Sequence, residues 1–398
     1  MKKFLNKVQV FILSAAGFTT TITVILIIIF LFQNGFKLFN QHPYEEPTAL
    51  ITSADVKHRN LTNEEIKEIF DQKITNWKEV GGDDNEIQIA TLDNIASSAT
   101  EEELGTDMVN LGIIINKYFA EQKGTISFFP EKYLNKEFPG HRIKIKKVGV
   151  FDFFRGKEWI PTAKPVAQLG ALPLILGTIW VSLGAILLAL PLGLMVAIYL
   201  SEIASKRMKQ FVKPLIELLA GIPSVVYGFF GLVVLVPMIQ KLFKLDVGET
   251  ALSGSIILGI MALPTIITIA EDSITAVPKV MREASLALGA NKWQTIYKVI
   301  LPYASSGITA AIVLGIGRAM GETMAVIMVT GNAASMPHTY LQPVRTIPAT
   351  IAAELGEAPY GGLHFQALFA LGCILFIITM IFNIYVGYIK NKNKIISG

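Results

Sequence analysis

Cysteine, histidine and charge are all scarce in this sequence. It has a single cysteine, Cys373, and five histidines in 398 residues. One cysteine cannot form an internal disulfide or a thiolate cluster, so a disulfide scaffold and a cysteine-based zinc site are excluded. The histidines show no metal-type spacing, and no Ser-His-Asp pattern or Walker A motif occurs. The chain is therefore not expected to be an enzyme.

Charged residues make up 17% of the chain and hydrophobic residues 52%, which is far from a soluble composition. Crossing a membrane takes about 20 predominantly apolar residues. Six stretches of that length occur, near residues 10–32, 170–199, 214–240, 251–275, 305–330 and 366–389. The sequence predicts an all-α polytopic membrane protein with six transmembrane helices.

Lysine and arginine gather at alternate ends of these six stretches, and cationic connections stay in the cytoplasm. The net charge of +4 is explained by these flanks and requires no nucleic-acid partner. The first stretch is longer than the apolar core of a signal peptide, so we interpret residues 1–40 as an uncleaved anchor. Both termini are then expected in the cytoplasm, with residues 41–165 outside and a five-span core over residues 166–398.

Residues 41–165 have a soluble composition. Thr62 and Glu65 form a capping-box pattern ahead of a short amphipathic helix. "EIQIATL", "GTISFF" and "RIKIKKVGV" are typical of strands, and residues 100–122 of a helix. We expect a small inserted α/β domain of about 100 residues. Its hydrophobic core is marginal on its own.

The loop at residues 278–302 lies between the fourth and fifth stretches. A helical stretch begins near Glu283, Gly289 allows a tight reversal, and "KWQTIYKVILP" suggests a second short helix ended by Pro302. An ordinary amphipathic connection is one explanation. The other is a compact knob that docks on a soluble partner. The sequence here resembles the EAA loop by which permeases of ABC importers engage their ATPases, through Glu283, Ala284, Ser285, Gly289, Val299, Leu301 and Pro302. Ser285 departs from the family's alanine.

The fifth stretch carries two charges at membrane depth, which are costly unless they are paired or face water. Arg318 and Glu322 are four residues apart, a spacing that places them on one helical face. They are either a structural salt bridge or part of an anion path, in which Arg318 binds the anion and Glu322 weakens its hold. Gly315, Gly317 and Gly321 would make room for that path.

"GRAMGETMAV" followed by "GN", together with "IELLAGIPSVVYGFFGL" and "VRTIPATIAAELGEA", resembles the phosphate importer permeases of the PstC type. The resemblance implies the ABC importer permease fold in the bacterial inner membrane, with Thr323 and Asn332 joining Arg318 and Glu322 in the substrate path. It also implies a sister permease, an ATPase dimer that holds ATP and Mg²⁺, an external phosphate-binding protein, and no cofactor on this chain. A permease for molybdate or tungstate, or a membrane receptor or scaffold, stays open as an alternative.

"LTNEEIKEIFDQKITNWKEVGGDDNEIQI" in the insert resembles a segment of the phosphate-binding proteins themselves. In those proteins a loop rich in serine, glycine and threonine binds phosphate at a helix N-terminus. Here the matching stretch keeps Ser97, Ser98 and Thr100 but is followed by acidic residues. The hypothesis is a degenerate fragment that no longer binds phosphate and instead docks the binding protein or the membrane rim.

Overall fold

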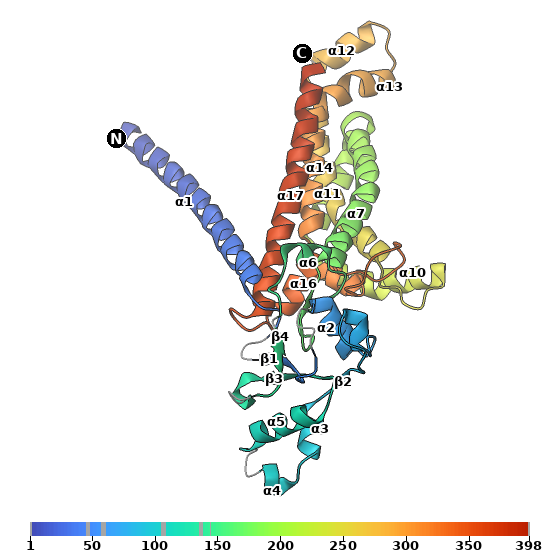
Figure 1. Ribbon diagram of the computed structural model, residues 1–398. Helices are drawn as coiled ribbons and strands as arrows, with labels where there is room; N and C mark the ends of the chain where they lie inside the picture. Colours follow the sequence, from blue (N-terminus) through green and yellow to red (C-terminus); the bar gives the residue numbers. More distant parts are fainter. Residues whose placement is uncertain are drawn as a thin grey trace. The chain divides into compact units, whose positions relative to one another are not determined.

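The computed structural model describes residues 2–44, 48–56, 61–104, 109–134, 138–143 and 145–396. The chain divides into two compact units, coloured by sequence in Figure 1. Unit 1 comprises Met1–Gly170 and Ala358–Ala367, and unit 2 comprises Ala171–Glu357 and Leu368–Gly398.

Unit 1 begins with the long helix α1 (Lys2–Lys37), followed by the 3-10 turn η1 (Leu38–Asn40). Threonine hydroxyls in α1 bond back to carbonyls one turn earlier, as Thr19 does to the Ala15 oxygen at 2.9 Å. Most side chains from Val10 onward are exposed and apolar. Such a helix has its backbone and side-chain polar groups satisfied internally, which suits a lipid environment.

The globular part of unit 1 is built on a four-stranded sheet. Strand β1 (Thr48–Thr52) pairs antiparallel with both β3 (Thr125–Pro130) and β4 (His141–Ile143), and β2 (Gln88–Ile89) runs parallel to β3. Alternate residues point to opposite faces of a strand. Leu50 accordingly packs with Ile66 and Trp77 in one core, and Ile51 with Ile115 and Phe119 in another. Helices cover both faces: α2 (Asn63–Phe70) and η2 (Trp77–Val80) on one, α3 (Leu92–Ser97) and α5 (Leu111–Glu121) on the other.

The local predictions for this unit are partly confirmed. Thr62 and Glu65 form the complete capping box, and "GTISFF" forms β3. "EIQIATL" is a strand only at β2, with an isolated bridge from Glu86 to Asn76, and "RIKIKKVGV" contributes Arg142 and Ile143 to β4. The helix expected over residues 100–122 is instead α4 (Glu101–Leu104) and α5, and residues 105–108 lie outside the described part. The remaining elements are η4 (Glu131–Tyr133), α6 (Val150–Arg155), β5 (Trp159–Ile160) and β6 (Gln168–Leu169).

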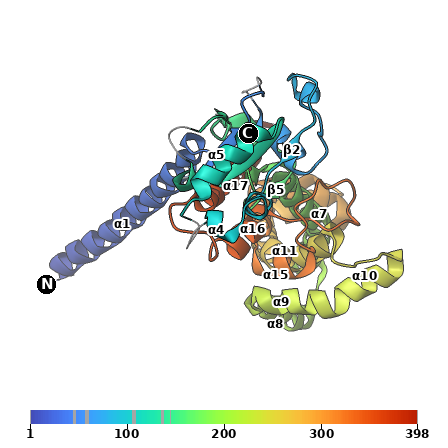
Figure 2. The same ribbon diagram turned by 60° about the horizontal axis from the view of Figure 1, so that its bottom comes forward.

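Unit 2 is entirely helical in its described part. The long helix α11 runs beside α7 and α14, and small residues such as Ala185, Ala262 and Ala311 are buried where these helices pack (Figures 1 and 2). Its helices are α7 (Leu172–Ile198), α8 (Lys206–Gly221), α9 (Ser224–Phe230), α10 (Val236–Phe243), α11 (Ala251–Thr275), α12 (Lys279–Ala287), α13 (Lys292–Thr295), α14 (Leu301–Gly321), α15 (Met324–Val329), α16 (Ile347–Glu354) and α17 (Leu363–Ile396), whose first residues belong to unit 1. Three π turns join consecutive helices: η5 (Tyr199–Ile203), η6 (Gly231–Leu235) and η7 (Ile296–Ile300).

Among the described residues, six helical segments are long and apolar enough to cross a membrane, which confirms the predicted number of spans: Val10–Asn40, Leu172–Ile203, Ser224–Phe243, Ala251–Thr275, Lys292–Gly321 and Leu363–Tyr388. The bounds predicted for the third span, residues 214–240, are wrong. Helix α8 ends at Gly221, and Ile222 is extended, with φ −69° and ψ 128°. A residue before proline disfavours the helical conformation, so Pro223 separates α8 from α9.

The prediction of one helix over residues 305–330 is also wrong. Helix α14 ends at Gly321, Glu322 is extended with φ −71° and ψ 134°, and α15 starts at Met324. Glu322 and Thr323 are polar residues that follow a glycine within an apolar stretch. Broken helices of this kind occur at membrane depth where the freed backbone lies within protein or lines a water-filled cavity.

Candidate functional site

The 278–302 loop begins with α12, which starts directly after Pro278 and ends at a reversal on Gly289. Gly289 has φ +86°, and the Ala290 N–H reaches back to the Ser285 carbonyl at 3.2 Å. This is the left-handed helix end that glycine favours. Asn291 and Gln294 then form a capping box that starts α13. The predicted pair of helices joined by a glycine turn is confirmed.

The prediction that Pro302 ends the second helix is wrong. Helix α13, the π turn η7 and α14 are continuous, and Leu301 and Pro302 are the first two residues of α14. Proline has no N–H to donate and crowds the preceding turn of an α-helix. In η7 the Leu301 N–H bonds to the Ile296 carbonyl, five residues back. The wider turn accommodates Pro302 without a break, and η6 precedes Pro237 in the same way.

The loop exposes large apolar side chains among charged ones. Glu283 and Ala284 are exposed, as are Val280, Leu288 and Trp293. Leu288, at the tip, is 89% exposed. Large exposed apolar side chains next to one another mark interaction surfaces more often than single ones do.

Ser285 links the two arms of the loop, because its Oγ lies 3.0 Å from Thr295 Oγ1. Thr295 is buried and also donates to the Asn291 carbonyl at 3.2 Å. The serine that departs from the family's alanine therefore makes an additional hydrogen bond inside the loop.

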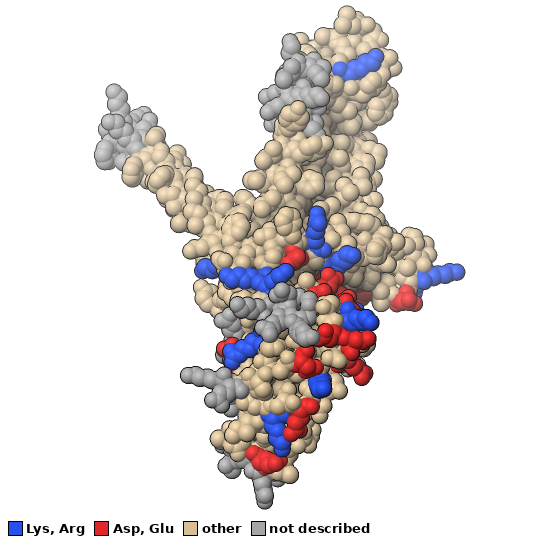
Figure 3. All heavy atoms as spheres, in the orientation of Figure 1, with Lys and Arg blue, Asp and Glu red and all other residues tan. Residues whose placement is uncertain are grey.

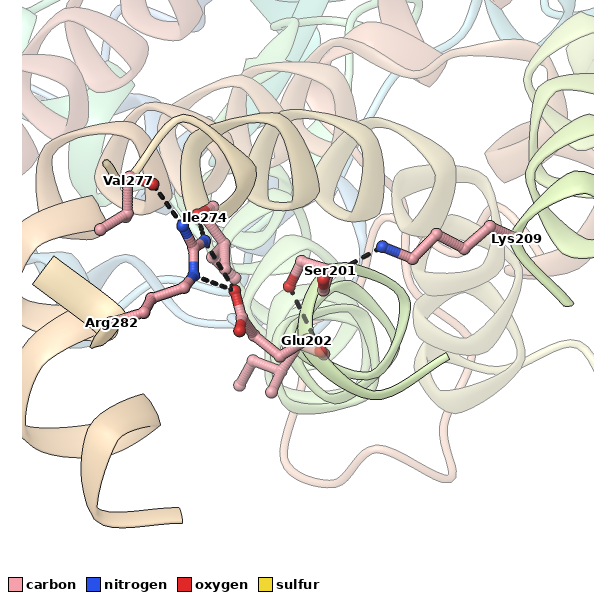
Figure 4. Close-up of polar contacts among 7 residues, drawn as sticks. Ser201, Glu202, Lys209, Ile274, Val277 and Arg282 are labelled. Atoms are coloured by element: carbon pink, nitrogen blue, oxygen red, sulfur yellow. Dashed lines mark hydrogen bonds and ion pairs between the residues drawn. The ribbon is translucent and has the colours of Figure 1, made fainter. Parts of the chain in front are cut away.

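Arg282 joins the start of the loop to two other helices (Figure 4). Its Nη2 and Nε atoms lie 2.7 Å and 3.1 Å from one carboxylate oxygen of Glu202, in the π turn η5. The same guanidinium donates to the backbone carbonyls of Ile274, at 2.8 Å, and Val277, at the end of α11. Only 19% of the Arg282 side chain and 10% of the Glu202 side chain are exposed. The Arg282 guanidinium donates four hydrogen bonds to largely buried acceptors. This contact is therefore expected to be more stable than an ion pair on the surface.

The end of α11 also contacts α8 through charge. Lys213 Nζ lies 3.1 Å from Glu271 and 3.9 Å from Asp272. The hydrogen bond to the Glu271 carboxylate raises the pKa of the Lys213 ammonium. The sequence predicted no pairing of Glu202, Glu271 or Lys213. These contacts leave no periodic signal, because the partners lie far apart in the chain.

The second group of predicted residues lies at the break between α14 and α15. Arg318 is in the last turn of α14, half-buried, and has no hydrogen bond or ion pair within the described residues. The predicted pairing with Glu322 is not formed, because Glu322 lies beyond the helix end. The Glu322 carboxylate instead faces the Ala325 N–H at 3.5 Å, at the start of α15. Among the residues that the structure describes, the Arg318 guanidinium therefore has no ion-pair partner, and the salt bridge with Glu322 is not formed.

Thr323 and Asn332 stand at opposite ends of α15. Thr323 lines an open hollow with Gly321, Ile351 and Leu355. Asn332 follows the helix in a left-handed conformation, with φ +49°, and its side-chain amide donates to the Ile327 carbonyl at 2.9 Å. The structure thus brings Thr323, but not Asn332, to the break that follows Arg318.

Arg345 is another arginine near this region, and two of its guanidinium nitrogens have partners. It donates to the Asn332 carbonyl at 2.9 Å and to the Glu354 carboxylate at 2.6 Å. Of these two arginines, only Arg318 lacks a counter-ion among the described residues.

The three glycines predicted to line the path have different surroundings. A Cβ atom on Gly315 would lie 2.9 Å from Ile266 Cγ1, so Gly315 is a packing residue. A Cβ on Gly317 or Gly321 would meet nothing within 4 Å. Only Gly317 and Gly321 therefore lie beside open space.

The hydroxyls of the predicted phosphate-loop remnant are used locally. Ser97 and Ser98 donate to the carbonyls of Asn94 and Ile95, at 3.1 Å and 2.7 Å. Thr100 Oγ1 accepts the Glu103 N–H at 3.4 Å, and the Thr100 N–H donates to Glu103 at 3.0 Å. These contacts lower the pKa of the Glu103 carboxyl, which keeps a negative charge beside the loop.

The chain belongs to the family of binding-protein-dependent transport system inner membrane components, whose family model matches residues 189–395. It is 39% identical over 251 residues to the probable ABC transporter permease protein YqgH of Bacillus subtilis, covering 63% of this chain and 81% of that protein. It is 38% identical over 250 residues to the phosphate transport system permease protein PstC of Mesorhizobium japonicum, covering 58% of this chain and 75% of that protein. A chain of the MetNI methionine ABC transporter aligns at 18% identity and a TM-score of 0.43, over 56% of this chain and 94% of that one.

Proposed function

We propose that this chain is one of the two permease subunits of an ATP-driven importer of inorganic phosphate, and that Arg318 contacts the anion during its passage. The unpaired guanidinium at the α14–α15 break carries the proposal. Arginine stays charged at any physiological pH and presents a planar set of donors that suits phosphate oxygens. An arginine without a protein counter-ion at membrane depth is costly unless an ion or water serves it. Similarity to the phosphate permease of Mesorhizobium japonicum supports phosphate as that ion.

The 278–302 loop is the surface on which an ATPase dimer docks in this proposal. Its exposed apolar tip supports a protein contact, and Arg282 supports transmission of a movement from the loop to α7 and α11. A sister permease would complete the path, and an external phosphate-binding protein would deliver the anion. The distribution of lysine and arginine supports both termini in the cytoplasm and residues 41–165 outside. ATP and Mg²⁺ would be held by the ATPase, with no cofactor on this chain.

Uptake of labelled phosphate into cells carrying the complete importer tests the role of Arg318. We expect Arg318→Gln to abolish uptake while the subunits still co-purify, because Gln keeps a hydrogen-bonding group but removes the charge. Lys241→Gln, which removes an exposed cation at the end of α10, is the matched control and should transport normally. Normal uptake by Arg318→Gln would disprove the assignment.

Competition by other tetrahedral anions tests the substrate. Excess phosphate should suppress labelled uptake, whereas molybdate and tungstate should not. Suppression by molybdate at lower concentration than by phosphate would instead assign the importer to that oxyanion, leaving the role of Arg318 intact.

A further inference from the structure

A ladder of aromatic rings runs from α1 into the globular part of unit 1. Ring centroids are 5.8 Å apart for Phe32 and Phe36, and 6.5 Å for Phe36 and Phe39. Phe39 then meets the buried Phe153 of α6 edge-on at 5.9 Å. Such edge-to-face contacts have a preferred geometry, so α6 is held against the end of α1.

Backbone contacts fix the same junction. The Val148 N–H donates to the Gln41 carbonyl at 3.1 Å, and His42 Nδ1 lies 3.1 Å from the Ile145 carbonyl. These bonds join the segment that leaves α1 to the segment that leads into α6. The position of α6 relative to the outer end of the first span is thereby set by backbone as well as side chains.

The length of the span determines the depth of this junction. Val10–Asn40 contains 31 helical residues. At a rise of about 1.5 Å per residue this is about 46 Å, longer than a hydrocarbon core of about 30 Å. The span is therefore long enough for its last turns, with Phe36 and Phe39, to reach the head-group region.

Helix α6 carries apolar side chains that nothing in the described chain covers. Phe151 is 76% exposed, and Val150 and Phe154 are also exposed beside it. Arg155, in the same helix, lies over the Phe151 ring at 5.9 Å. Several exposed cations lie near α6 in the chain or at the end of α1, and α6 also carries the exposed Asp152; the cations are Lys37, Lys146, Lys147, Arg155 and Lys157. Figure 3 shows Lys and Arg atoms gathered where α1 meets the rest of unit 1. Exposed aromatic groups among cations are typical of segments that lie in a membrane interface.

We propose that α6 is an interfacial helix, with Phe151 and Phe154 inserted into the phospholipid head-group region of the leaflet in which α1 ends. The lipid surface is the occupant because the ladder continues the lipid-facing span directly into α6. The basic side chains in and near α6 would be attracted to the phosphate groups of the lipids. This contact would fix the orientation of the insert relative to the membrane surface. The role depends on neither phosphate transport nor the ATPase.

Spin labels on the full-length chain in phospholipid nanodiscs test this proposal. Cys373, the single native cysteine, is replaced by Ala, and one cysteine is introduced as Phe151→Cys. Ile113→Cys on α5, 62% exposed and apolar, is the reference within the globular part, and Val24→Cys in α1 is the reference for lipid. Each label is scored by its collisions with oxygen, which concentrates in lipid, and with a water-soluble nickel chelate.

We expect the label at 151 to resemble the one at 24, with more oxygen than nickel collisions, and the label at 113 to show the opposite ratio. Equal access of nickel to positions 151 and 113 would place α6 in water and overturn the proposal. Low access of both reagents at 151 would show that protein covers α6, which would overturn it equally. Phe151 is exposed, so its substitution removes no core packing.

Discussion

Arg282 and Glu202 are 80 residues apart in sequence, yet two guanidinium nitrogens of Arg282 lie 2.7 Å and 3.1 Å from one Glu202 oxygen. The remaining donors of Arg282 reach carbonyls at the end of α11 (Figure 4). One side chain therefore ties the 278–302 loop to the ends of two membrane-spanning segments.

Breaking this contact should uncouple the importer. Removing one partner of a largely buried ion pair costs about 3–5 kcal/mol, because the other charge is left without a partner. We expect Glu202→Ala to lower the melting temperature of the purified subunit and to reduce the phosphate transported per ATP hydrolysed. Arg282→Lys keeps the charge but has no planar fork, so it should be intermediate in both measurements.

Lys209→Ala is the matched control for that experiment. Lys209 is also drawn in Figure 4, but it makes a single hydrogen bond, from Nζ to the Ser201 carbonyl at 3.0 Å. Its removal should change the ratio of transport to hydrolysis little. Equal losses for Lys209→Ala and Glu202→Ala would show that any change near η5 disturbs the protein, and that the ion pair has no special role.

Gly289 should tolerate asparagine better than valine. Its φ of +86° is unfavourable for a side chain by about 1–2 kcal/mol, and asparagine bears that conformation better than a β-branched residue. A Cβ there would meet nothing within 4 Å, so the effect comes from the backbone alone. Co-purification with the ATPase should be nearly normal for Gly289→Asn and weak for Gly289→Val. Equal binding by both variants would contradict a need for this turn.

Much of the architecture could be predicted from the sequence because apolar length and local capping are local properties. Six spans, the Thr62 capping box and the Gly289 turn all depend on residues a few positions apart. The breaks at Ile222 and Glu322 were missed, because both stretches stay apolar through the break. The local signal for the break at Ile222 is Pro223, and the signal for the break at Glu322 is the polar pair Glu322 and Thr323 after Gly321.

The site was less predictable, because its contacts join distant segments. Arg318 and Glu322 have the spacing of a helical pair, yet the helix ends between them. Proline often ends a helix, yet the helix continues through Pro302 because the π turn before it leaves room for the ring. The contacts of Arg282 with Glu202, Ile274 and Val277 depend on the packing of three helices, which no local pattern specifies.

Substitution by alanine should destabilise the protein at one glycine of α14 and leave its stability unchanged at another. A Cβ on Gly307 would lie 1.9 Å from Ser273 Oγ and 2.5 Å from Ser273 Cβ, whereas one on Gly317 would meet open space. Overpacking typically costs about 1–3 kcal/mol. Thermal unfolding of the purified subunit should show a clear loss for Gly307→Ala and no loss for Gly317→Ala. Loss of stability in Gly317→Ala would mean that a partner segment fills the space beside it.

A larger side chain at Gly317 tests whether that open space belongs to the path. A Cβ at position 317 would meet nothing within 4 Å, so Gly317→Leu should leave the melting temperature near normal but reduce phosphate uptake strongly. Met320→Leu, at a buried position three residues further on, is a volume-conserving control that should transport normally. Full uptake by Gly317→Leu would show that the anion passes elsewhere.

The insert should contribute nothing to phosphate binding. The hydroxyls of Ser97, Ser98 and Thr100 are engaged by their own backbone, and Glu103 keeps a negative charge beside them. Replacing all three by alanine should leave the concentration dependence of phosphate uptake unchanged, in contrast to Arg318→Gln. Thr100→Ala also removes a helix cap, which typically costs about 1 kcal/mol, so a small loss of thermal stability is expected. A rise in the phosphate concentration needed for half-maximal uptake, without loss of assembled complex, would show that the insert still binds the anion.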